Sequence, residues 1–202
     1  MRTVFVTGTD TDAGKTIVSG LLARYLLGKG CRVITQKWIQ AGSRGFSKDI
    51  DAHLKLMNKK RQDINGYLSY VAPYNFRFGA SPHLAACLER RKISILKIKQ
   101  GFRLLTKNFD FVIVEGTGGV LVPINRKRLL IDIAKELDLP VLVVVKNRLG
   151  AINHTLLTIE AIRSRRMRIL GIIFNSQCKP ENKAVLRDNP RIIKALTGEK
   201  IL

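Results

Sequence analysis

The sequence predicts an α/β fold: a mostly parallel sheet flanked by helices in three layers. Two observations predict this class. Short β-branched runs alternate with stretches of helical periodicity, as they do when a parallel sheet is covered by helices. The later runs are almost unbroken apolar segments, which is typical of strands buried on both faces. With 202 residues, 46% of them hydrophobic and only six prolines, the chain suits one globular domain over residues 1–202.

Five segments are expected to form the strands, at residues 3–7, 31–35, 109–114, 140–145 and 169–174. Three helices between them have recognisable beginnings or apolar faces. Ser47 can cap one helix, Ser81-Pro82 combines a cap with proline at the first helical position, and another is expected from about 153 to 164. Their inward faces are predicted to be Ile50, Leu54 and Met57, then Leu84, Ala85 and Leu88, then Leu156, Ile159 and Ala161.

A glycine-rich turn joins the first strand to a helix that runs through Leu21, Leu22 and Leu26. It reads Gly8-Thr-Asp-Thr-Asp-Ala-Gly14-Lys15-Thr16, with five residues between its glycines where the common phosphate loop has four. In such a loop the backbone N–H groups and the helix N-terminus face phosphate, the lysine contacts the β- and γ-phosphates, and the hydroxyl binds Mg²⁺. The sequence therefore predicts a fold of the phosphate-loop nucleoside triphosphatase type.

Carboxylates are expected near these phosphates, because Mg²⁺ prefers oxygen ligands. Glu115 follows the strand 109–114, so it should share the carboxyl rim of the sheet with the phosphate loop. Asp49 and Asp51 lie on the first turn of the Ser47-capped helix, where acids also complement the helix dipole. The residues alone leave a metal role for either aspartate open.

The charge is the unusual compositional feature: 36 Lys and Arg face 15 Asp and Glu, a formal net charge of +21. Such an excess raises the hypothesis of a nucleic-acid partner. No apolar run approaches the roughly 20 residues of a membrane helix, and the first residues do not resemble a signal peptide. Cys31, Cys87 and Cys178 form no CxxC pair, which favours reduced thiols and a cytoplasmic location.

Four segments together resemble the dethiobiotin synthetases, ATP-dependent enzymes of biotin synthesis. They are residues 8–16, 114–124, 149–158 and 171–175. The third contains Leu-Gly-Ala-Ile-Asn-His, the most discriminating of the four, and the resemblance extends from residue 1 to about 197. It implies a reaction of 7,8-diaminopelargonate, CO₂ or bicarbonate, and ATP with Mg²⁺. The amine forms a carbamate, the carbamate is phosphorylated, and the second amine closes the cyclic urea of dethiobiotin.

The resemblance also implies roles for individual positions. Catalytic roles fall to Lys37, Lys15 and Thr11, and Mg²⁺ is assigned to Thr16, Asp51 and Glu115. Nucleotide contacts are implied for Asp12, Ala13, Gly14, Lys15, Thr16, Glu115, Gly116, Thr117, Gly118, Asn175 and Ser176. Substrate contacts are implied for Thr11, Lys37, Ala41, Ser81, Gly150, Ala151 and Asn153, the last three across the interface of a homodimer.

The sequence departs from the family pattern at several positions. Trp38 replaces a proline after Lys37 and is expected to reshape the substrate entrance, and Ala41 replaces a hydroxyl residue whose contact Ser43 could supply. In the family, a turn that contributes to the base pocket follows the position of Leu202. The sequence therefore supports phosphate binding better than a preference for adenine.

The alternative is a partitioning-type phosphate-loop ATPase switch that binds DNA. Such a switch would have a second lysine early in the loop, where this chain has Thr9 and Asp10. Its basic residues are also scattered over several helix ends and turns. Both features make a nucleic-acid partner the weaker hypothesis.

Overall fold

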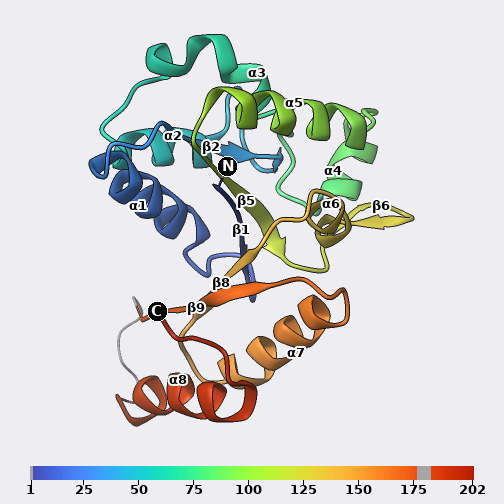
Figure 1. Cartoon of the computed structure of the whole chain (residues 1–202). Helices are drawn as coiled ribbons and strands as arrows, with labels where there is room; N and C mark the ends of the chain where they lie inside the picture. The colour runs from blue at the N-terminus through green and yellow to red at the C-terminus, as the bar shows by residue number, and fades with distance from the viewer. Residues whose placement is uncertain (1, 177–182) are drawn as a thin grey trace.

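A five-stranded parallel sheet with the order β2-β5-β1-β8-β9 forms the centre of the computed structural model, which describes residues 2–176 and 183–202 (Figure 1). All five predicted strands are present, and each begins within two residues of its expected position. The third is longer than expected, so Glu115 lies inside it. The strands are β1 Arg2–Gly8, β2 Val33–Lys37, β5 Phe111–Gly119, β8 Val141–Lys146 and β9 Ile169–Asn175.

Helices connect these strands and cover the sheet. They are α1 Lys15–Gly28, α2 Lys48–Leu56, α3 Leu68–Val71, α4 Pro82–Leu88, α5 Ile95–Asn108, α6 Leu130–Glu136, α7 Ala151–Arg163 and α8 Lys183–Thr197, with a 3₁₀ helix at Arg61–Tyr67. Two short pairs complete the described elements: β3 Ile39–Gln40 with β4 Tyr74–Asn75, and β6 Pro123–Asn125 with β7 Arg128–Leu129.

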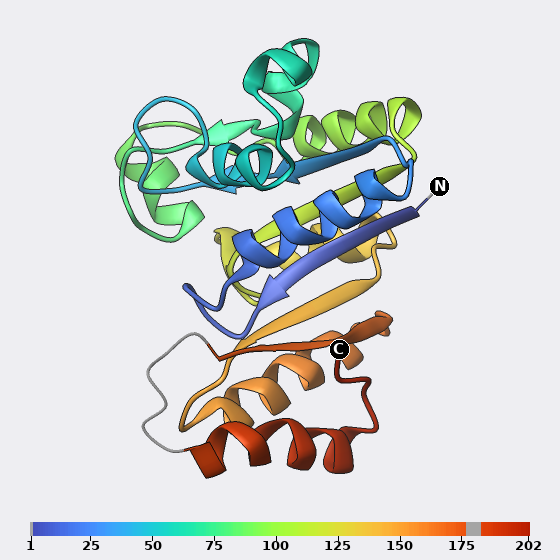
Figure 2. The same cartoon turned by 90° about the vertical axis from the view of Figure 1, so that its left-hand side faces the viewer.

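The sheet is buried on both faces, which confirms the three-layer prediction. In β1, Val4 and Val6 belong to the apolar cluster beneath α1, whereas Phe5 belongs to the larger cluster on the other side. This alternation follows from the two-residue repeat of a strand. Helix α1 covers one face and contacts α2, while α5, α6 and α7 cover the other and α8 packs on α7 (Figure 2).

The C-terminal residues extend the sheet beyond β9. Ile201 forms a parallel bridge with Ile172, whose amide donates to the Lys200 carbonyl while its own carbonyl accepts from Leu202. Residues far apart in sequence thus share one sheet edge.

The predicted helix signals are confirmed for α2 and α7. Ser47 caps α2, its hydroxyl accepting from the Ile50 amide at 3.2 Å, and Ile159 is buried in α7. The predicted apolar face of α4 is wrong for Leu84 and Leu88, which are 44% and 51% exposed. Pro82, Ala85 and Ala86 make the buried side instead, since residues three to four apart share one side of a helix.

Among residues 2–176 and 183–202, no helix is long and apolar enough to cross a membrane. Cys31 and Cys87 are free thiols, and Cys178 lies outside the described residues.

Candidate active site

The turn between β1 and α1 is a compact loop, and at two of its positions only glycine fits. Gly14 has φ of 100°, and a Cβ there would lie 2.3 Å from Asn175 Nδ2. A Cβ on Gly8 would lie 2.9 Å from the Asp10 carbonyl oxygen. Asn175 donates to the Ala13 carbonyl at 3.1 Å, so β9 supports the loop from the side. The loop is therefore held closed around the first turn of α1.

Lys15 folds back into this loop. Its Nζ donates to the Asp10 carbonyl at 2.8 Å, and the side chain is almost completely buried. Burial lowers the pKa of Lys15 to about 8, and the nearby Lys37 ammonium contributes to the same shift. No carboxylate lies within ion-pair distance of its Nζ in the described part of the chain, so its charge is available to an anion.

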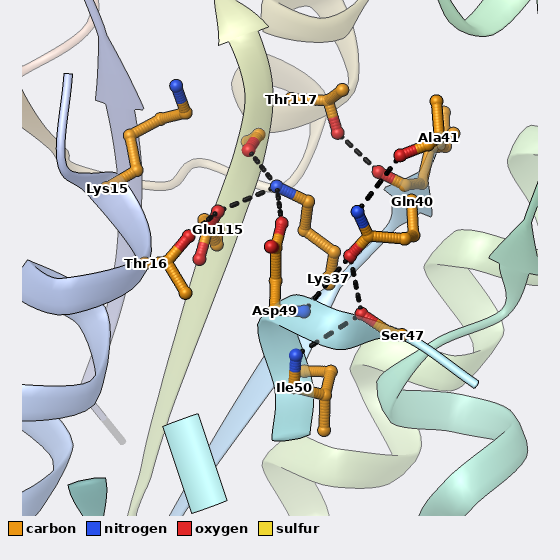
Figure 3. A network of polar contacts seen from close by, with 12 residues as sticks. Lys15, Thr16, Lys37, Gln40, Ala41, Ser47, Asp49, Ile50, Glu115 and Thr117 are labelled. Carbon is orange, nitrogen blue, oxygen red and sulfur yellow. Dashed lines mark hydrogen bonds and ion pairs between the residues drawn. The ribbon is translucent and has the colours of Figure 1, made fainter. Parts of the chain in front are cut away.

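A second buried lysine, Lys37 at the end of β2, lies between two carboxylates (Figure 3). Its Nζ is 2.7 Å from Asp49 Oδ2, 2.7 Å from Glu115 Oε1 and 2.8 Å from the Gly116 carbonyl oxygen. Three acceptors thus match the three protons of the ammonium. Burial alone would lower the pKa of Lys37, but Glu115 and then Asp49 outweigh it and raise the pKa.

Glu115 is 1% exposed, and its two oxygens have different partners. Oε1 accepts from Lys37 and, at 3.1 Å, from the Thr16 hydroxyl. Oε2 is 2.6 Å from His53 Nε2. Burial would raise the pKa of this carboxyl, but Lys37 and then His53 hold it well below its usual range. Glu115 is therefore an ionised buried carboxylate.

The structure does not bring Asp51, which was expected among the Mg²⁺ ligands, into this cluster. Asp51 pairs with Arg61 at 2.5 Å on the outer side of α2, and it does not line the cavity described below. Asp49 occupies the place in the cluster that was expected for Asp51. Residues two positions apart in a helix are separated by about 200° around its axis. Because Asp49 faces Lys37, Asp51 must point away from it.

Asp49 is oriented by Gln40, which the sequence did not single out. Gln40 Oε1 accepts from the Ser47 hydroxyl at 2.8 Å and from the Asp49 amide at 3.2 Å (Figure 3). Next to it, the Thr117 hydroxyl donates to the Ile39 carbonyl. The loop after β2 is thereby tied to both α2 and β5.

These groups line a cavity of about 730 Å³ at the carboxyl ends of the strands. This is where open α/β sheets bind ligands. The expected residues that line it are Thr11, Asp12, Gly14, Lys15, Thr16, Lys37, Ala41, Ser81, Glu115, Thr117, Gly118 and Asn175. Asp49 and Gln40 line it as well, together with Ile17, Pro82 and Val122.

Other expected residues lie outside this cavity. Gly116 and Ala13 contribute backbone carbonyls to Lys37 and Asn175, and Ser176 accepts from Asn147. The segment Gly150, Ala151 and Asn153 begins α7 without reaching the cavity, and the adjoining Leu149 is 83% exposed. Ser43 donates to the Phe46 carbonyl and does not replace the hydroxyl absent at Ala41.

Trp38 does not reshape the entrance as expected. It is fully buried and stacks on Phe5 with ring centroids 5.5 Å apart. Its Nε1 donates to Gln36 Oε1, and Gln36 in turn donates to the Tyr70 carbonyl. The ring belongs to the same apolar cluster as Phe5, whereas Lys37 next to it lines the cavity.

The sequence did not single out His53, but helical spacing links it to Asp49. Asp49 and His53 are four apart, so they share one side of α2, and both contact the lysine–glutamate pair. Helical phase thus links His53 to Asp49, whose metal role the sequence alone left open.

Fold and site together define an α/β protein of the phosphate-loop class, with one lysine in the loop and a second between two carboxylates. A family model described as an AAA domain matches residues 2–202. The chain is 38% identical over 194 residues to ATP-dependent dethiobiotin synthetase BioD 2 of Haemophilus influenzae, covering 95% of this chain and 99% of that one. It is 40% identical over 193 residues to ATP-dependent dethiobiotin synthetase BioD of Chlorobaculum tepidum, covering 95% and 80%. The chain belongs to the dethiobiotin synthetase family.

The fold is shared more widely. The solved structure of pNOB8 ParA bound to nonspecific DNA aligns with a TM-score of 0.62 at 12% identity, covering 100% of this chain and 78% of that one. At this identity the likeness shows the fold alone.

Proposed function

We propose that the chain is an ATP-dependent dethiobiotin synthetase that joins 7,8-diaminopelargonate and CO₂ into a cyclic urea. The observation that carries the proposal is the meeting of Lys15, Lys37 and Glu115 in one cavity at the phosphate loop. An amine of the substrate takes up CO₂ as a carbamate, losing a proton. A carbamate oxygen attacks the γ-phosphorus and ADP leaves; the second amine then attacks the carbonyl carbon and phosphate leaves.

The protein's task in these steps is to position reactants and stabilise negative charge. Lys15 and the backbone of residues 12–16 would bind the phosphates of ATP. Lys37 would contact the carbamate and the γ-phosphate, and in doing so exchange one of its present acceptors for a ligand oxygen. Thr11, Ala41 and Ser81 line the part of the cavity assigned to the diamine. Asn175 lines the side assigned to the base, and Ser176 follows it outside the cavity.

The donor set fits Mg²⁺. A hydroxyl from Thr16 and carboxylates from Asp49 and Glu115 converge on the phosphate loop, and these are the hard oxygen donors this ion prefers. Mg²⁺ also takes phosphate oxygens as ligands, so the protein need supply only part of its coordination shell. Bound there, Mg²⁺ would neutralise phosphate charge during transfer.

The test is phosphate release from ATP. It should require both 7,8-diaminopelargonate and bicarbonate and be indifferent to DNA. Release that DNA stimulates and the diamine leaves unchanged would replace this proposal with a partitioning-type ATPase.

We also propose that one domain, residues 1–202, acts in the cytoplasm as a homodimer with the substrate site at its interface. The support is that Leu149, just before α7, and Asn153, on its first turn, are exposed and do not line the cavity of their own chain. Mixing a Lys37→Ala chain with an Asn153→Ala chain should restore up to about a quarter of wild-type activity, because half the dimers are mixed and each then has one intact site. No restoration, with dimers exchanging subunits, would contradict an interface site.

A further inference from the structure

His53 is a buried polar residue to which the proposed function gives no role. It lies on α2, is fully buried, and does not line the cavity. Its Nε2 is 2.6 Å from Glu115 Oε2. Because an ionised carboxylate only accepts hydrogen bonds, Nε2 carries the proton and donates.

The ring's other nitrogen is an exception to the usual rule for buried polar atoms. His53 Nδ1 is buried without a hydrogen-bond partner among the described residues. Such an atom is destabilising, and an apolar side chain of similar size would avoid it. Packing alone therefore does not account for a histidine at this position.

The two oxygens of Glu115 are held from opposite sides. Thr16 and Lys37, the partners of Oε1, both line the cavity and both are assigned ligand contacts in the proposed reaction. His53, the partner of Oε2, lies behind the carboxylate and away from ligand. The hydrogen bond from His53 is thus the one that can remain when Thr16 and Lys37 turn to ligand.

We propose that His53 is a positioning residue: by holding Oε2, it fixes the Glu115 carboxylate so that Oε1 is presented to the metal–nucleotide complex. This inference rests on the proposed function for the identity of that complex. Outer partners of this kind are worth on the order of 10–100-fold in metal affinity.

The experiment is a calorimetric titration of a non-hydrolysable ATP analogue, with Mg²⁺ and with a chelator. His53→Leu should weaken binding with Mg²⁺ by about 10–100-fold and leave binding in chelator within about threefold. His53→Gln, which keeps a donor, should recover most of the Mg²⁺ contribution. An unchanged Mg²⁺ contribution in His53→Leu, or equal losses with and without Mg²⁺, would overturn the inference.

Leu54→Ala is the matched control. Leu54 is buried next to His53 on α2, and its cavity should lower stability without touching Glu115. It should keep the full Mg²⁺ contribution; if it loses as much as His53→Leu, the effect is one of folding and the inference is wrong.

Failure of the proposed function would look different. Wild-type protein that binds the analogue with Mg²⁺ but never turns over the diamine refutes the synthetase, while the comparison of variants still decides the role of His53. Wild-type protein for which Mg²⁺ adds nothing to binding refutes the His53 role outright.

Discussion

Lys37 and Asp49 form a 2.7 Å ion pair between the end of β2 and the first turn of α2. With Glu115 and the Gly116 carbonyl, Asp49 completes the set of acceptors around the ammonium. Lys37 therefore has no proton left for a ligand until one of these contacts opens. A ligand that binds Lys37 must therefore replace one of its contacts within the protein.

The first prediction separates the two aspartates of α2. Asp49→Asn should lower turnover by more than about tenfold and raise the Mg²⁺ concentration needed for half-maximal rate, because a carboxylate next to Glu115 is lost. Asp51→Asn removes an exposed pair with Arg61 and should change turnover less than about twofold. Steady-state rates over a range of Mg²⁺ measure both; a larger loss in Asp51→Asn would restore the assignment made from the sequence.

The contrast between these residues shows where sequence reasoning succeeded and where it stopped. The five strands were predictable because strands buried on both faces read as short apolar runs between segments of helical periodicity. The phosphate loop was also predictable, since its residues are contiguous. The rotation of α2 about its axis brings Asp49 and His53 to the site, and the path of the chain after β2 brings Gln40. No local sequence repeat encodes that rotation or that path.

Trp38 is the converse case: its position in the sequence suggested the site, but it lies in the apolar cluster. Its position after Lys37, a lysine proposed to be catalytic, suggested the substrate entrance, but successive residues of an extended chain point to opposite sides. Lys37 points to the cavity, so Trp38 points into the apolar cluster and stacks on Phe5.

The second prediction follows from that packing. Trp38→Ala should lower the free energy of unfolding by about 3–5 kcal/mol, as removal of a large buried aromatic does. Trp38→Phe keeps a ring against Phe5 and should lose less. Urea denaturation measures both, and KM for the diamine in Trp38→Phe should stay within about threefold of wild type. A large change in that KM with unchanged stability would place Trp38 at the entrance after all.

The third prediction concerns Lys37 itself. Lys37→Ala should lower turnover by at least about 10²–10³-fold, because a donor to developing negative charge is removed. Affinity for the ATP analogue should change little, since Lys15 and the loop backbone are the groups proposed to bind the phosphates. The variant also leaves Glu115 and Asp49 without their cation, so its folding must be verified by circular dichroism before the rates are compared. A pure loss of nucleotide affinity at normal turnover would show that Lys37 acts in binding.

The fourth prediction uses the pKa of Lys15, which burial lowers to about 8. Above that pH the free protein has lost the Lys15 proton, whereas bound phosphates favour the charged form and raise its pKa. Binding above about pH 8 must therefore take up a proton, and affinity should fall as pH rises, by up to about tenfold per pH unit.

Calorimetric titration of the ATP analogue in buffers of different ionisation enthalpy measures this uptake directly. It should approach one proton at about pH 9 and be small at about pH 7, in proportion to the uncharged fraction of Lys15. Lys15→Arg is the control, because arginine stays charged throughout this range, and its affinity should be nearly independent of pH. Wild-type binding without proton uptake at about pH 9 would mean that Lys15 is already fully charged in the free loop, and that its burial does not lower its pKa.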